Sequence, residues 1–158
     1  MKTIGTASIL ALCVITRIGV QKPDTAKPLD TFESVNVCDR VPVAEAAKAL
    51  GGRAIEARPV NVKGFTAARC VYGIEINGGR RAFVIWLNPA KDFDELRAAS
   101  EPPITVVKGV GDAAYLAVDK DTKRYWLRAV KRNAVTIQVT GDEPGWVNTL
   151  AMLTLSKF

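Results

Sequence analysis

A hairpin signal in the middle of the chain constrains the fold more than any other sequence feature. Residues 70–76 alternate between apolar and other side chains, and residues 81–87 continue the alternation after the tripeptide Asn77-Gly78-Gly79. An Asn-Gly pair between two alternating segments favours a tight turn that joins antiparallel strands. Because residues 81–87 are apolar on both faces, we expect the second strand to be central in its sheet.

Further strands are predicted in the second half of the chain. The segments 104–107, 113–118, 123–130 and 134–140 are rich in apolar residues and are separated by glycine-rich or polar turns. In the last two strands, one face would carry Tyr125, Leu127, Ala129, Val135, Ile137 and Val139. The opposite face would carry Trp126, Arg128, Thr136 and Gln138.

The glycines at positions 109 and 111 also match, together with Ala114, a fingerprint of dinucleotide-binding proteins. That fingerprint requires a long helix directly after the glycines and an acidic residue about 20 positions further on. Here a polar turn follows residues 113–118, and Lys131 and Arg132 stand where the acidic residue is needed. We therefore interpret the glycines as turn residues, and we expect no cofactor.

Three helices are predicted around these strands. Residues 42–50 place apolar side chains along one face and end at two glycines. A second helix would begin near Phe93, after Asp92 in a capping-box pattern, and end near Ser100. A third would be capped by Asp142, with Trp146, Leu150 and Leu153 along its inner face. Since strand–helix–strand repeats do not dominate, we predict an α+β fold with a mainly antiparallel sheet of five to six strands packed with three helices.

The N-terminal segment predicts export. Lys2 precedes an uncharged apolar run at residues 4–16, which suits a signal peptide and is shorter than the roughly 20 residues of a membrane span. Residues 1–20 are therefore interpreted as a signal peptide or N-terminal anchor, residues 21–34 as a linker and residues 35–158 as one domain. Lipid attachment at Cys13 stays an alternative, although Leu12 is not the small residue that normally precedes an acylated cysteine.

The two remaining cysteines, Cys38 and Cys70, form an even pair. In an exported protein such a pair usually forms a disulfide. The alternative is two buried free thiols in a cytosolic protein. A metal site is not expected, because two thiolates without histidine leave the coordination incomplete.

The complete absence of histidine among the 158 residues excludes several kinds of chemistry. Histidine is the commonest general base and the commonest metal ligand. Its absence excludes Ser-His-Asp and Cys-His catalysis and all zinc sites that contain histidine. An enzyme of this sequence would depend on carboxylates, lysine or tyrosine, and we expect the protein not to be an enzyme.

Several of these features together resemble a group of small bacterial cell-envelope proteins and lipoproteins of largely unknown function. The resemblance covers residues 35–158. It rests on Cys38 before an alanine-rich helix, Cys70 at the start of a strand, the segment 109–115 (Gly-Val-Gly-Asp-Ala-Ala-Tyr) and a terminal helix after a meander. It implies a PsbP-like α/β/α sandwich and an envelope location, and it implies no catalytic residues.

The best candidate for a binding surface is the strand face with Trp126, Arg128, Thr136 and Gln138. Tryptophan beside arginine is a composition typical of binding hot spots. The more ordinary interpretation is that a helix covers this face and that Trp126 belongs to the core. Asp119 and Asp121 have the spacing of two calcium ligands but lack the rest of a calcium loop.

Basic residues gather in the same region, and three interpretations of them stay open. Nucleic-acid binding would use them for phosphate contacts, an exported protein would meet an anionic envelope component instead, and lysines also commonly protect a solvated sheet edge. These residues are Lys120, Lys123, Arg124, Arg128, Lys131 and Arg132.

The function that we expect from the sequence is a non-enzymatic binding or assembly module, exported to the periplasm or cell exterior. Its partner would be an envelope protein or an anionic envelope component and not nucleic acid, and the N-terminus could attach it to the membrane. Two alternatives are a carrier of a small apolar ligand or lipid and a small enzyme without histidine.

Overall fold

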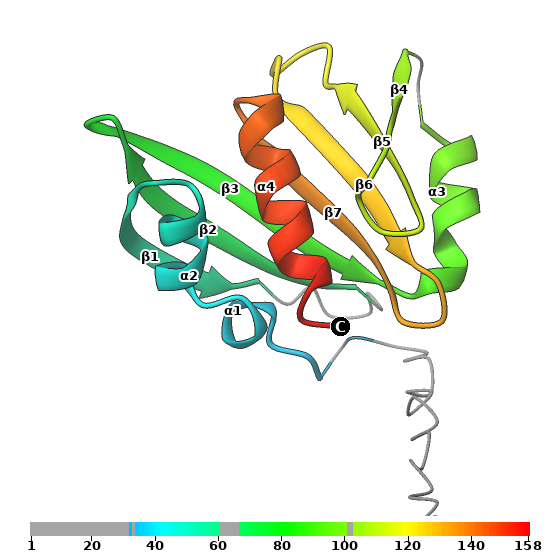
Figure 1. Ribbon diagram of the computed structural model, residues 1–158, viewed down its shortest axis with the longest axis horizontal. Helices are drawn as coiled ribbons and strands as arrows, with labels where there is room; N and C mark the ends of the chain where they lie inside the picture. Colours follow the sequence, from blue (N-terminus) through cyan, green and yellow to red (C-terminus); the bar gives the residue numbers. More distant parts are fainter. Residues whose placement is uncertain (1–31, 33, 61–66, 101–102) are drawn as a thin grey trace, which may run out of the picture.

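One antiparallel sheet organises the molecule, with its strands in the order β1-β2-β3-β7-β6-β5-β4 (Figure 1). The computed structural model describes residues 32, 34–60, 67–100 and 103–158. The strands are β1 (Arg53–Pro59), β2 (Ala68–Ile76), β3 (Gly79–Asn88), β4 (Ile104–Val107), β5 (Ala113–Val118), β6 (Tyr125–Lys131) and β7 (Val135–Gly141).

The predicted hairpin is confirmed as β2–β3. Asn77 and Gly78 both have positive φ angles, 52° and 75°, and Ile76 pairs with Gly79 across the turn. Positive φ at both central residues is the geometry that matches the twist of the flanking strands. β3 lies between β2 and β7, so its predicted central position is also confirmed.

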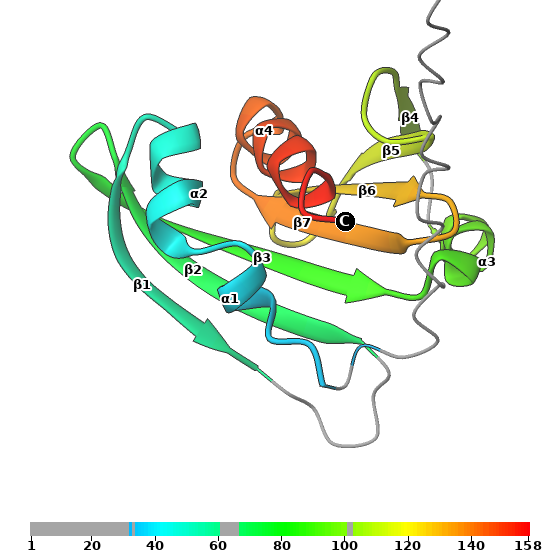
Figure 2. The same cartoon turned by 60° about the horizontal axis from the view of Figure 1, so that its bottom comes forward.

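Four α-helices and one 3-10 helix accompany the sheet. They are α1 (Val37–Arg40), α2 (Val43–Ala49), the 3-10 helix η1 (Ala90–Asp92), α3 (Phe93–Ala98) and α4 (Pro144–Leu155). Figure 2 shows α2 and α4 together on one side of the sheet, where the main core lies. α3 and η1 pack against β6 and β7 on the opposite side, where Phe93, Tyr115 and Val130 form a small second cluster.

The main core joins distant parts of the chain. Tyr72 in β2 is fully buried, and its hydroxyl donates a hydrogen bond of 2.9 Å to the carbonyl oxygen of Val41. Phe32, within the segment that we predicted as a linker, is also fully buried and meets Phe158 edge-on, with ring centroids 6.4 Å apart. Both ends of the described chain therefore contribute to one core.

The predicted fold class was wrong in its proportions. The sheet has seven strands instead of five to six and carries four short α-helices instead of three, so that strands hold 42% and helices 27% of the described residues. β1 was missed because its exposed side chains include Arg53, Glu56 and Arg58, so it shows no apolar alternation. α1 was missed because four residues are too few for a periodic pattern. This architecture is more sheet-dominated than the predicted sandwich of five to six strands and three helices.

The termini of two helices also differ from the prediction. Glu143, and not Asp142, is the N-cap residue of α4, and no side chain caps that helix. The buried face of α4 consists of Val147, Leu150, Ala151, Thr154 and Leu155, whereas Trp146 and Leu153 are only partly buried. Asp92 precedes α3 but makes no capping hydrogen bond, so the predicted capping box does not form.

The predicted cysteine pair is confirmed as a disulfide. Cys38 in α1 and Cys70 in β2 are bonded, with their Cα atoms 5.3 Å apart. The bond fastens α1, a helix that we did not predict, to the sheet. The predicted signal peptide, its alternative as an anchor, and Cys13 lie outside the described residues. Among the helices that the structure describes, none is long and apolar enough to cross a membrane.

Candidate anion-binding cleft

A cleft of about 760 Å³ lies on the α3 side of the sheet. Its floor is formed by side chains of β6 and β7, one wall by α3 with Ser100, and the other wall by the turn between β5 and β6. The lining residues are Leu96, Ala99, Ser100, Val118, Asp119, Lys120, Asp121, Thr122, Arg124, Trp126, Arg128, Gln138 and Thr140.

Arg128 is the best-connected side chain of the floor. Its Nε donates a hydrogen bond of 2.7 Å to Oε1 of Gln138, the residue directly opposite on β7. Its Nη1 donates to the carbonyl oxygen of Leu96 at 2.7 Å and lies 3.1 Å from the hydroxyl of Tyr115 and 3.3 Å from that of Ser100. These contacts come from α3, β5, β7 and Ser100, which lies two residues beyond α3, so four parts of the chain orient one guanidinium group.

Aromatic rings support the same guanidinium group. It lies over the indole ring of Trp126, 4.9 Å from the ring centroid. Tyr115 meets Trp126 edge-on at 5.7 Å between centroids and Phe93 at 5.5 Å. Trp126 is half-buried: it packs against the cluster of Phe93, Tyr115 and Val130 and also lines the cleft.

The charge of Arg128 is not neutralised by any carboxylate of the described residues. Its hydrogen-bond acceptors are an amide oxygen, a backbone carbonyl and two hydroxyl groups, all of them neutral. Within the described parts of the chain, its Nη2 has no hydrogen-bond partner. A half-buried cation of this kind is poorly compensated by neutral dipoles, and an anion in the cleft would stabilise it.

Two carboxylates lie on the opposite wall, in the β5–β6 turn. Oδ1 of Asp119 accepts hydrogen bonds from the backbone N–H groups of Asp121 and Thr122 and from the hydroxyl of Thr122. The hydrogen bonds from Thr122 lower the pKa of Asp119 below its ordinary value. Asp119 therefore shapes the turn, and the described residues contain no cluster of three or more metal-ligating side chains that would make it a calcium site.

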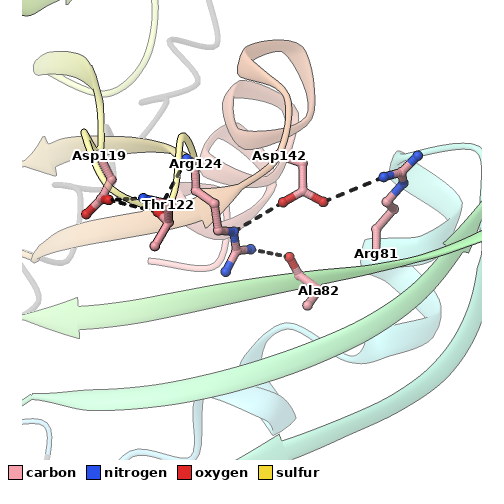
Figure 3. Close-up of polar contacts among 6 residues, drawn as sticks. All are labelled: Arg81, Ala82, Asp119, Thr122, Arg124 and Asp142. Atoms are coloured by element: carbon pink, nitrogen blue, oxygen red, sulfur yellow. Dashed lines mark hydrogen bonds and ion pairs between the residues drawn. The ribbon is translucent and has the colours of Figure 1, made fainter.

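A second group of polar contacts borders the cleft and is centred on Asp142. Its carboxylate lies 3.2 Å from Nε of Arg124 and 3.9 Å from Nη1 of Arg81 on β3, as Figure 3 shows. Arg124 also donates to the carbonyl oxygen of Ala82. Asp142 thus connects the start of β6 with β3 instead of capping α4, and it neutralises Arg124 at the rim of the cleft.

The structure brings three of the four predicted binding residues together. Trp126, Arg128 and Gln138 line the cleft, whereas Thr136 is fully buried and its hydroxyl donates to the carbonyl oxygen of Ala90 at 3.3 Å. The sequence analysis missed Tyr115 and Ser100 as partners of Arg128. Tyr115 ends the glycine-containing segment that we singled out, but nothing in the sequence indicated that Ser100 lies beside it.

The basic residues of the meander do not form one patch. Lys120, Lys123 and Arg124 lie before β6, and Lys131 and Arg132 lie at its other end, about 20 Å away along a seven-residue strand. The interpretation that lysines protect a sheet edge here was wrong, because β5, β6 and β7 all have neighbours on both sides.

The chain was also compared with protein families and with individual known proteins. No family model, curated protein or solved structure matches it.

Proposed function

We propose that this protein is a non-enzymatic binding module that holds an anionic group of a cell-envelope component in the cleft at Arg128. The observation that carries the proposal is the half-buried guanidinium group of Arg128, which is fixed by neutral acceptors and has no carboxylate partner among the described residues. Carboxylates and phosphates are the natural partners of such a group, because their charged oxygens can accept a hydrogen bond from Nη2, whereas Nε and Nη1 already donate within the protein.

The geometry of the cleft supports binding of a small charged group. Nη2 of Arg128 makes no hydrogen bond within the described residues, and the amide nitrogen of Gln138 beside it makes none either. The two groups sit next to each other on the floor, since Arg128 and Gln138 are direct cross-strand neighbours. Together they offer donors that are already oriented, which lowers the entropic cost of binding.

Binding fits the residue set better than catalysis does. The sequence has no histidine to act as a general base near neutral pH. Among the carboxylates of the cleft, Asp119 accepts hydrogen bonds from Thr122 that lower its pKa, which is the opposite of the raised pKa that a carboxylic acid needs to act as a general acid near neutral pH. Between α4 and the sheet, a Cβ atom at Gly141 would lie 2.8 Å from the ring of Phe83, so this layer is tightly packed and does not favour an apolar-ligand carrier.

The envelope location is supported by sequence and by cysteine chemistry. The apolar run at residues 4–16 suits an export signal, and Cys38 and Cys70 are paired. Intact-mass measurement of the protein from its native host, before and after reduction and thiol labelling, tests this part. We expect a shortened chain with one disulfide, and a full-length chain with free Cys38 and Cys70 would contradict it.

Titration with inorganic phosphate and with malonate, followed by two-dimensional ¹H–¹⁵N NMR, tests the anion site. We expect shifts concentrated in the cleft, including the Nε–H signal of Arg128. The variant Arg128→Gln should bind about ten- to a hundredfold more weakly, because a hydrogen bond to a charged group contributes about 1.5–3 kcal/mol.

Arg53→Gln is the matched control, because Arg53 is an exposed arginine on β1 that pairs with Glu75 away from the cleft. It should leave anion affinity unchanged. Equal affinity of the Arg128→Gln variant and the unmodified protein would contradict the proposal.

A further inference from the structure

A second arginine–tryptophan pair lies on the same face of the sheet, outside the cleft. The guanidinium group of Arg69 lies over the ring of Trp86, 4.6 Å from the centroid, much as Arg128 lies over Trp126 at 4.9 Å. All four side chains are half-buried. Two such pairs on one face suggest that the face recognises the same kind of group twice.

The strand register places the two arginines in one row across the sheet. Arg69 on β2 pairs with Trp86 on β3, Trp86 pairs with Gln138 on β7, and Gln138 pairs with Arg128 on β6. Three strand spacings of about 4.8 Å separate the Cα atoms of Arg69 and Arg128 by about 14 Å. The two residues between them are uncharged, so the row has a cation at each end and no acid in it.

The next row of the same face is mostly apolar. Val71, Val84, Thr140 and Trp126 are cross-strand neighbours in this order, and all are half-buried. α3 and η1 pack on β6 and β7, while α2 and α4 lie on the other side of the sheet (Figure 2). Between the two cations the face is therefore partly apolar and half-buried.

Besides Arg69 and Arg128, this face carries Arg58, an exposed residue of β1 that lies opposite Val71 and diagonally from Arg69. Arg69, like Arg128, has no carboxylate partner among the described residues, and its Nε is buried without a hydrogen bond. The acids toward the other end of β1 and β2, Glu56 and Glu75, are paired with Arg80 and Arg53. A ligand that reaches from one free cation to the other must carry at least two anionic groups.

We propose that this row binds one chain of an acidic polysaccharide, laid across the strands from Arg128 to Arg69. The proposal rests on the proposed anion site and names its ligand class. Sugar rings present apolar C–H faces that suit the partly apolar row of Val71, Val84 and Trp126, while their carboxylates reach the two arginines. A nucleic acid fits less well, because each indole ring already carries a guanidinium group where a base would have to stack.

Galacturonic acid as monomer, tetramer and octamer, titrated by calorimetry at constant ionic strength, tests the proposal. We expect the octamer to bind at least about tenfold more tightly than the monomer, because the second contact becomes intramolecular. Arg69→Gln should remove this gain, so that the octamer binds no more tightly than a monomer bound at Arg128, whereas Arg128→Gln should weaken binding of both the monomer and the octamer. Arg69→Lys, which keeps the charge, should retain part of the gain, and Arg53→Gln should retain all of it.

The outcomes separate the two proposals. If the monomer binds through Arg128 but the octamer binds no more tightly, the polysaccharide row is overturned and the anion site stands. The same conclusion follows if a folded Arg69→Gln or Arg69→Ala variant shows the full octamer gain. Failure of the monomer and of phosphate to bind overturns the anion site itself. Polyuridylate that binds as tightly as the octamer overturns the assignment to a polysaccharide.

Discussion

Nε of Arg128 donates a hydrogen bond of 2.7 Å to Oε1 of Gln138, its direct neighbour across β6 and β7. A neutral amide thus occupies the position where a carboxylate would form an ion pair. The variant Gln138→Glu should supply that carboxylate and compete with any anionic ligand. We expect phosphate affinity to fall roughly tenfold or more, measured by NMR titration, while the thermal midpoint of unfolding is maintained or raised.

Gln138→Met is the control for this change. It removes the acceptor without adding charge, so it should reduce phosphate affinity much less than Gln138→Glu does. If both variants bind phosphate as tightly as the unmodified protein, Arg128 is not the anion site.

Reduction of the disulfide should destabilise the fold strongly. Cys38 and Cys70 are 32 positions apart, and closing a loop of this length stabilises a protein by about 3–4 kcal/mol through the entropy of the unfolded chain. Urea unfolding with and without a reductant measures the effect. In the double variant Cys38→Ala, Cys70→Ala the reductant should make no difference, and an unchanged midpoint in the unmodified protein would show that the bond does not stabilise it.

Two glycines in one turn should respond very differently to alanine. Gly111 has φ +59° and a Cβ there would clash with the carbonyl oxygen of Val130, whereas Gly109 has φ +78° and open space around it. Gly109→Ala should cost about 1–2 kcal/mol for the left-handed backbone alone. Gly111→Ala should cost clearly more, because the backbone of β6 must move as well. Equal losses in chemical denaturation would contradict this difference.

The buried hydroxyl of Tyr72 should make stability depend on alkaline pH. Burial raises the pKa of Tyr72 well above its ordinary value, so the folded protein keeps the proton while the unfolded chain releases it near pH 10. The free energy of unfolding is therefore unaffected by this proton below about pH 10. It falls as the pH rises further, by about 1.4 kcal/mol at pH 11.

Comparison with Tyr72→Phe isolates that effect. At pH 7 the variant should be about 1 kcal/mol less stable, since it lacks the hydrogen bond to Val41. At pH 11 the difference should vanish or change sign, as measured by urea unfolding. A difference that is the same at both pH values would show that the hydroxyl does not titrate on unfolding.

Local signals allowed much of the sheet to be predicted. Asn77 and Gly78 specify a turn by their own backbone preferences, and the alternation of Leu127 and Ala129 with Trp126 and Arg128 fixes the two faces of β6. β1 carries no such signal. It is an edge strand whose alternate side chains meet water on both faces, and its place depends on its pairing with β2.

Long-range contacts made the site only partly predictable. The sequence placed Arg128 and Gln138 on one face, but it did not show that α3 would pack on that face and bring Leu96 and Ser100 to the guanidinium group. Asp142 was assigned to the helix because it precedes Pro144, whereas arginines on β3 and at the start of β6 hold its carboxylate. Arg69 lay just outside the predicted strand, so its pairing with Trp86 was missed.

The strand order has a consequence for how the chain folds. Five of the six strand pairings in the described residues join consecutive strands, and only β3–β7 brings together segments about 50 residues apart. Strands β1–β3 and strands β4–β7 can each form by pairing of strands that are neighbours in the sequence. The β3–β7 pairing, in contrast, requires that a long loop closes first. We therefore expect substitutions in the β3–β7 joint to accelerate unfolding more than they slow folding, the mark of contacts that form late.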